Sequence, residues 1–474
     1  MSYQHYIDLS RRESLQKMGT GLGILGLAGI LAQDGTLAAE PNSSFSGSPL
    51  SDRSGHFAPR AKHIIHLFMN GGPSQVDTFD PKPELDKHDG KRPMSADLKT
   101  ERKTGGLLKS PFAFKPYGES GIEVSDLFPH IGSCIDDICV IRSMHTDIPN
   151  HEPSLLMMNS GVTQPTRPAM GSWLLYGLGT ENQNLPGYMV LCPGKPVVGP
   201  QLWSNSFLPG IFQGTHINHS NLDPKKVIRH INNSYITRIS QRDQLDLLKR
   251  MNQIHLEKRG GRDNPLEARI ESLEMAYRMQ TEAQEVFDLG KETKETRSSY
   301  GPGQFADACL AARRLVESGV RMVQIYYGDG QPWDDHTNIK AHAEKAKHVD
   351  QPIAALLKDL KARDLLKDTL IIWGGEFGRM PISQVRAGAN VGRDHGPDGF
   401  SMWMAGGGVK AGHIYGATDD IGHKATEDRV SVHDFHATVL HLLGMDHKRL
   451  TFYHNGIQRR LTNVHGEVIR DILA

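Results

Sequence analysis

The sequence has few cysteines and no excess of either charge. Only four cysteines occur in 474 residues, without a CxxC pair, which argues against a structural zinc knuckle or a thioredoxin-type motif. Cys134 and Cys139 are close enough in sequence for a local disulfide, although two free buried thiols are the favoured interpretation. Lys plus Arg and Asp plus Glu both number 54, so the formal charge is zero. Because nucleic-acid-binding chains normally carry a basic excess, we expect no nucleic-acid partner.

A long apolar run is also missing. The uncharged stretch Met18–Gln33 is too short and too rich in glycine for a membrane span, which needs roughly 20 apolar residues. It follows Arg11 and Arg12 and precedes two alanines suited to a cleavage site, as in a twin-arginine signal peptide. We therefore predict that residues 1–39 direct export through the twin-arginine translocase to the periplasm or the extracellular space. The alternative is an amphipathic N-terminal helix of a cytosolic protein.

The rest of the chain has an ordinary composition and an alternating pattern. Hydrophobic residues make up 38% and charged residues 23%, as in globular proteins. Residues 40–60 are rich in Ser, Pro and Gly and predict a linker. Strands are predicted at 62–69, 137–144, 320–328, 369–375 and 400–408, and helices at 305–319, 351–366 and 430–444, with a helical insertion at about 236–297. This alternation predicts an α/β fold over residues 61–474, with a mostly parallel central sheet and helices on both faces.

Histidine is unusually abundant, with 24 residues, and we expect three loops with polar side chains to follow three of the predicted strands. The segment "WDDHTN" contains Asp334 and His336, "GGEFGRMP" contains Glu376 and Arg379, and "GRDHGPDG" contains three further residues: Arg393, Asp394 and His395. Loops that follow parallel strands open at the same edge of a sheet, so these groups are expected to converge. A single Asp-His pair is more often a helix cap or a bonded loop pair, but three such segments together favour a metal site.

Carboxylates and imidazoles are ligands for zinc, manganese or iron. We expect one or two divalent ions per chain, zinc or manganese, with Asp334, His336, Glu376, Asp394 and His395 as candidate ligands. Arg379 and Arg393 are candidate catalytic residues, since a guanidinium group can bind a tetrahedral anion through two hydrogen bonds.

Several motifs together resemble one family of exported bacterial proteins. "NGGPSQVDTFDPKP", "NHEP", "RPAMGSW", "WDDHTN", "GGEFGRMP" and "DHGPDGF" are similar to the family called domain of unknown function fifteen-oh-one, from about residue 60 to the C-terminus. The resemblance implies the alkaline phosphatase-like fold of phosphatases and sulfatases. It also implies two metal ions beside a Ser, Thr or modified Cys nucleophile at the carboxyl ends of the strands.

Two positions depart from the pattern of that superfamily. Asn70 is a further candidate metal ligand, standing where the first strand normally supplies an aspartate, and Asp77 or Asp80 is the alternative. His151 stands at the position of the nucleophile. Three roles therefore stay open for His151: a nucleophile, a further metal ligand or a general acid. If it is not the nucleophile, water activated by the metal is the alternative.

The sequence thus predicts an exported metal-dependent hydrolase of phosphate or sulfate esters. Its substrate would be a small-molecule or polysaccharide ester, and its oligomeric state stays open. The alternative is an exported binding protein that kept the fold and lost catalysis.

Overall fold

The computed structural model describes residues 49–92, 104–224, 226–227, 235–258, 264–384 and 391–474. The predicted signal peptide and the first part of the predicted linker lie outside these residues. The candidate site lies in the compact unit formed by Gly47–Phe452 and Gln458–Ala474. None of the described helices combines the length with the apolar composition that a membrane-spanning segment requires.

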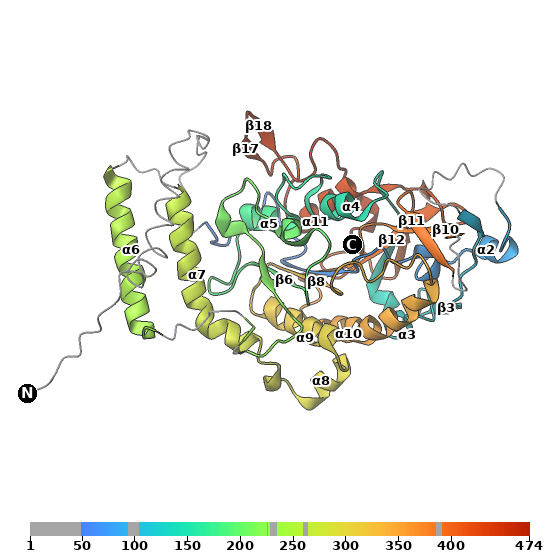
Figure 1. Cartoon of the computed structure of the whole chain (residues 1–474), viewed down its shortest axis with the longest axis horizontal. Helices are drawn as coiled ribbons and strands as arrows, with labels where there is room; N and C mark the ends of the chain where they lie inside the picture. Colours follow the sequence, from blue (N-terminus) through green and yellow to red (C-terminus); the bar gives the residue numbers. More distant parts are fainter. Residues whose placement is uncertain (1–48, 93–103, 225, 228–234, 259–263, 385–390) are drawn as a thin grey trace, which may run out of the picture. The chain divides into compact units, whose positions relative to one another are not determined.

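A nine-stranded sheet forms the centre of this unit (Figure 1). In spatial order its strands are β13 (His413–Tyr415), β5 (Ile138–His145), β12 (Phe400–Ala405), β9 (Thr369–Gly374), β1 (His63–Phe68), β8 (Met322–Tyr326), β6 (Tyr188–Leu191) and β7 (Thr215–Ile217), and β16 (Val430–Ser431) also pairs with β5. Strand β12 runs antiparallel to β5 and β9, and the other pairings are parallel. The predicted mostly parallel α/β sheet is confirmed.

Helices occupy the segments between the strands. They are α2 (Pro83–Lys87), α3 (Pro129–Gly132), α4 (His151–Ser160), α5 (Met170–Leu178), α6 (Arg238–Lys258), α7 (Asn264–Val286), α8 (Lys294–Tyr300), α9 (Gln304–Glu317), α10 (His342–Ala362) and α11 (Val432–Leu442). Helices α6 and α7 fall in the predicted helical insertion. Helix α10 begins earlier than predicted and includes Pro352, where the sequence suggested a helix start.

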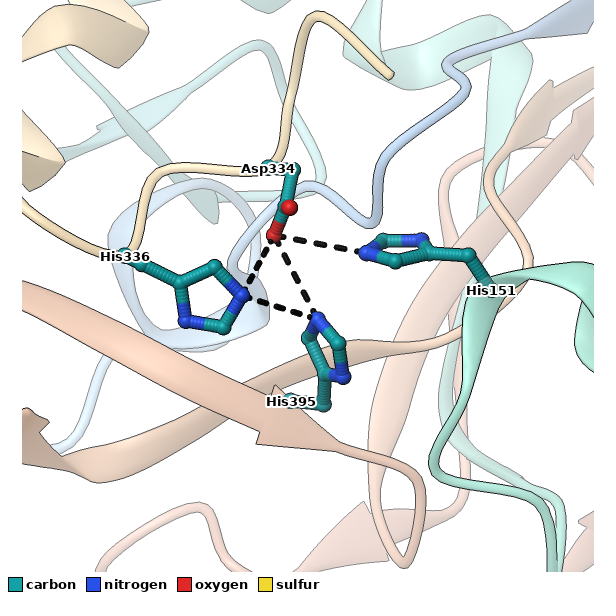
Figure 2. A group of neighbouring side chains, drawn as sticks. All are labelled: His151, Asp334, His336 and His395. Atoms are coloured by element: carbon teal, nitrogen blue, oxygen red, sulfur yellow. Dashed lines mark hydrogen bonds and ion pairs between the residues drawn. The ribbon is translucent and has the colours of Figure 1, made fainter. Parts of the chain in front are cut away.

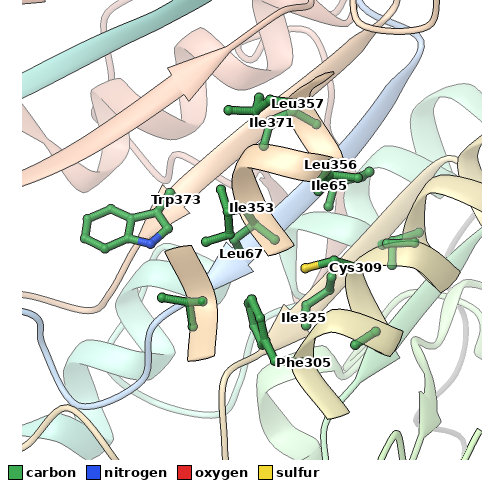
Figure 3. Close-up of a cluster of buried hydrophobic side chains, with 14 of the residues drawn as sticks. Ile65, Leu67, Phe305, Cys309, Ile325, Ile353, Leu356, Leu357, Ile371 and Trp373 are labelled. Atoms are coloured by element: carbon green, nitrogen blue, oxygen red, sulfur yellow. The ribbon is translucent and has the colours of Figure 1, made fainter. Parts of the chain in front are cut away.

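The large sheet is buried on both faces. All six residues of β1 are buried, because a parallel sheet covered by helices on both sides has no solvent face. Alternate β1 side chains enter different cores. Ile65 and Leu67 pack in one core with Phe305 of α9 and Ile353 of α10 (Figure 3). The opposite core, which contains Phe68, also contains buried residues of α4, α5 and α11.

Shorter strands lie outside the large sheet. They are β2 (Thr104–Leu107), β3 (Phe114–Tyr117), β4 (Ile122–Ser125), β10 (Gly378–Gln384), β11 (Gly392–Gly396), β14 (Ala417–Thr418), β15 (Ala425–Glu427), β17 (Phe452–His454) and β18 (Ile457–Arg459). Strand β10 pairs antiparallel with β11 and β2 in a small three-stranded sheet. The segment around His395, expected as a loop, is therefore a strand.

Candidate metal centre

The candidate site lies beyond the carboxyl ends of parallel strands. Asp334 and His336 come after β8, Glu376 comes directly after β9, and His151 follows β5 as the first residue of α4. His395 reaches the same edge by a different route. It lies on β11, just before β12, and the start of an antiparallel strand lies at the carboxyl edge of its parallel neighbours.

Four side chains converge at this edge: His151, Asp334, His336 and His395. We refer to them as the four-residue cluster. One potential ligand atom from each lies within 4.8 Å of those of the other three. Asp334 Oδ1 is 2.9 Å from His336 Nε2 and 3.3 Å from Nε2 of both His151 and His395. Figure 2 shows the imidazole nitrogens pointing toward that oxygen.

The cluster is largely buried but open on one side. The side chains of His151 and His336 are 8% and 10% exposed, whereas those of Asp334 and His395 are 22% and 15% exposed. A small group from solvent can therefore approach Asp334 and His395.

The hydrogen bonds behind two of the imidazoles fit a bound cation. His151 Nδ1 is 2.7 Å from Glu376 Oε1, and His336 Nδ1 bonds to Gln384 Oε1. When each Nδ1 donates to these oxygens, a neutral ring keeps only a lone pair on Nε2. Those lone pairs face a carboxylate oxygen, so each contact becomes favourable when a proton or a metal cation lies between the two atoms. Among the described residues, His151 Nε2 meets no partner in hydrogen-bonding geometry, and its polar neighbour is Asp334 Oδ1 at 3.3 Å.

Three imidazole nitrogens and one carboxylate oxygen form a donor set that suits zinc, and also manganese or iron. The four donor atoms lie close enough to one another to bind a single ion. The residues present thus fit the metal that the family resemblance implies, with His151 as a member.

The surroundings of Asp334 strongly favour the ionised form of its carboxyl group. Burial alone would raise the pKa of Asp334, but His151, His336, His395 and the Arg379 guanidinium hold it far below its ordinary value. Burial would lower the pKa of His151, but Asp334 and Glu376 outweigh it and raise that pKa. The pKa of His395 is lowered, chiefly by burial. An anionic oxygen among imidazoles is the electrostatic environment that a cation requires.

Glu376 lies behind His151 and outside the four-residue cluster. Its side chain is buried, and its carboxylate accepts hydrogen bonds from the Gly71 backbone N–H and from His151 Nδ1. These contacts hold the imidazole in place from the far side.

The two candidate arginines are completely buried and bonded within the protein. Arg379 donates to Asp334 Oδ1 at 2.7 Å and to carbonyl oxygens, which are those of Gly71, Gly72, Trp333 and Arg393. Arg393 donates hydrogen bonds to both carboxylate oxygens of Asp77, from Nε to Oδ2 at 2.6 Å and from Nη2 to Oδ1 at 3.1 Å. Neither guanidinium group is placed to bind a substrate anion in this structure.

Asn70 and Asp394 lie close to the cluster without joining it. Asn70 Nδ2 donates to the carbonyls of Gly328 and Gly330 at 3.0 and 2.6 Å. Its buried Oδ1 has no hydrogen-bond partner among the described residues. Asp394 Oδ1 accepts from the His395 N–H and lies 3.6 Å from His336 Nδ1. Asp394 thus supports two cluster residues from behind.

Two supporting residues were not foreseen from the sequence. Gln384 bonds to His336, and the Phe377 ring lies 4.8 Å from that of His151 and 4.7 Å from that of His395. Neither residue type is a common metal ligand, and no spacing in the sequence marks them.

Several solved structures are similar to this chain at low identity. Ps i-CgsB is 13% identical with a TM-score of 0.38, covering 81% of this chain and 72% of its own. The lipoteichoic acid synthase LtaP from Listeria monocytogenes is 7% identical with a TM-score of 0.36, covering 87% and 79%. A protein in the alkaline phosphatase superfamily from Vibrio parahaemolyticus is 10% identical with a TM-score of 0.36, covering 90% and 75%. Likeness at this level carries no information about activity.

No curated protein matches the sequence. The comparison with protein families does give a match: residues 61–473 match the family described as "Protein of unknown function (DUF1501)". That range covers almost the whole chain beyond the predicted linker. The chain therefore belongs to this family.

Proposed function

We propose that this protein is an exported, metal-dependent hydrolase of phosphate or sulfate esters. The observation that carries the proposal is the four-residue cluster, in which four potential ligand atoms lie within 4.8 Å of one another and two side chains are partly open to solvent. A divalent ion bound there would polarise an ester oxygen and make a nearby water more acidic.

Helix α4 supports binding of an anionic ester at the same place. His151 is the first residue of this helix, so the backbone N–H groups of His151 and Glu152 lie at the helix end beside the cluster, whereas Pro153 has none. The Asn150 side chain does not cap them. Uncapped N–H groups and the positive end of the helix dipole favour anionic oxygens. This contribution replaces the one first expected from Arg379 and Arg393.

We assign His151 to metal binding rather than to nucleophilic attack. Its Nε2 faces Asp334, and its Nδ1 is engaged by Glu376. Direct attack by water, without a covalent intermediate, is the route that these residues support.

One observation favours the alternative of a binding protein without catalytic activity. Arg379 and Arg393 are both committed to internal contacts, so the charged side chains expected to hold an ester are not available. Such a protein would bind a metal and an anionic ligand without turnover.

Export remains part of the proposal. It is supported by Arg11 and Arg12 ahead of a short apolar run, which would be read by the twin-arginine translocase. A periplasmic or extracellular enzyme would meet small-molecule or polysaccharide esters.

Turnover of aryl phosphates and aryl sulfates by purified protein, before and after chelation, tests the proposal. We expect hydrolysis of at least one substrate, its loss on chelation and its recovery with Zn²⁺ or Mn²⁺. Asp334→Asn should abolish the activity, whereas replacement of the exposed Glu344 by Gln should not. Metal binding without turnover of any ester would favour the binding protein.

A further inference from the structure

The segment Glu376–Gln384 contacts every member of the four-residue cluster and contributes no member to it. Glu376 bonds to His151, Phe377 packs on His151 and His395, Arg379 bonds to Asp334, and Gln384 bonds to His336. The segment runs from the short connection after β9 to the end of β10, so one stretch of backbone carries all four supporting side chains.

We propose that Glu376–Gln384 is a positioning element that sets the ring orientation and tautomer of the ligand histidines, and thereby the metal affinity. The proposal rests on the metal centre proposed above. It gives "GGEFGRMP" a role different from the one expected, because Glu376 supports a ligand instead of being one.

Glu376 acts on His151 as a hydrogen-bond acceptor. Its Oε1 lies 2.7 Å from His151 Nδ1, and when this oxygen accepts the hydrogen bond, the proton of a neutral His151 is on Nδ1. The lone pair is then on Nε2, the nitrogen that faces Asp334. The Gly71 N–H, 3.0 Å from the same Oε1, fixes the position of the carboxylate.

Gln384 acts on His336 in the same way. Its side chain is buried, and its Oε1 accepts from His336 Nδ1. Nε2 of His336 is then the nitrogen that faces Asp334, at 2.9 Å. Two histidines thus present the same nitrogen to one centre because each has an acceptor behind it.

Phe377 and Arg379 restrict the remaining freedom. The Phe377 ring lies against both His151 and His395, which limits rotation of the two imidazoles. Arg379, held by backbone carbonyls, anchors the Asp334 carboxylate. Loss of such supporting contacts typically lowers metal affinity by about 10- to 100-fold.

The test is Zn²⁺ affinity, measured by competition with a chromophoric chelator on the metal-free full chain. Glu376→Ala and Gln384→Leu should each bind Zn²⁺ about 10- to 100-fold more weakly than wild type. Glu376→Gln and Gln384→Glu keep an acceptor oxygen and should recover most of that loss. Asp350→Ala is the matched control, since Asp350 is buried and accepts two backbone N–H bonds from α3 away from the cluster. It should lower the melting temperature and leave Zn²⁺ affinity unchanged.

The possible failures are distinguishable. Wild-type affinity in Glu376→Ala, or equal losses in the Ala and Gln variants, would overturn the positioning role while leaving the metal centre intact. A loss in Asp350→Ala as large as that in Glu376→Ala would reduce the effect to general destabilisation and also overturn it. Wild-type protein that binds no Zn²⁺ would overturn the metal centre and this inference with it.

Discussion

Arg379 and Asp334 form an ion pair, with 2.7 Å between Nη2 and Oδ1, that links the buried core to the candidate site. The arginine has no exposed surface, whereas the Asp334 side chain is partly exposed at the cluster. Carbonyl oxygens of Gly71, Gly72 and Trp333 hold the same guanidinium group. The buried arginine therefore fixes the position of the Asp334 carboxylate, which stays partly exposed to solvent at the cluster.

Arg379→Ala should destabilise the fold as well as the site. Removing the guanidinium group leaves a largely buried carboxylate and several carbonyl oxygens without their donor, which should cost about 3–5 kcal/mol in the free energy of unfolding. Urea denaturation measures it. The exposed pair of Lys361 with Asp137, 2.6 Å apart, is the control, and Lys361→Ala should cost less than about 1 kcal/mol. Equal costs for the two variants would show that Arg379 is not a structural anchor.

Asp77 should make the free energy of unfolding decrease at acid pH. Burial alone would raise the pKa of Asp77, but Arg393 and Ser74 bring it below its ordinary value. A lowered folded-state pKa gives stability that is present above about pH 4, the ordinary pKa of aspartate, and is lost as pH falls through the folded-state pKa. Asp77→Asn should therefore be far less stable than wild type at pH 7, with a smaller difference at pH 3.

Urea denaturation at the two pH values checks this expectation. Asp86→Asn, at an exposed position on α2, is the control and should match wild type within about 0.5 kcal/mol at both. If the gap between wild type and Asp77→Asn stayed constant from pH 7 to pH 3, the ion pair with Arg393 would not be its source.

Export should depend on the paired arginines. Replacing Arg11 and Arg12 with lysines keeps the charge but removes the element that the translocase reads, so the protein should stay in the cytoplasm. Fractionation with immunoblotting measures it, and lysine in place of Arg53, beyond the predicted signal, is the control. Normal export of the double variant would rule out the twin-arginine route.

The sequence was most informative about buried strands, because each is visible as a continuous apolar run. The apolar runs of β1, β5, β8, β9 and β12 predict strands because buried strands in a parallel sheet are apolar on both faces. Asp334 and His336 follow such a strand and do reach the cluster. Convergence could be expected there from the geometry of parallel sheets alone.

The sequence was least informative about partners distant along the chain. The guanidinium group of Arg379 is occupied by carbonyls of Gly71 and Gly72, about three hundred positions away, and backbone acceptors leave no trace in residue types. The same reason hides Gln384 and Phe377, whose roles come from the folding of β10 beside the cluster. Residue type alone could not separate Glu376, a support, from Asp334, a candidate ligand.

The central claim is that His151, Asp334, His336 and His395 hold one metal ion. Anomalous diffraction at the zinc absorption edge, from crystals of the Zn²⁺-loaded protein, tests it most directly. We expect one strong peak at the cluster, with Nε2 of each histidine and an oxygen of Asp334 at roughly 2.0–2.2 Å from the ion. A cluster without anomalous density, in crystals whose protein contains stoichiometric zinc elsewhere, would contradict it.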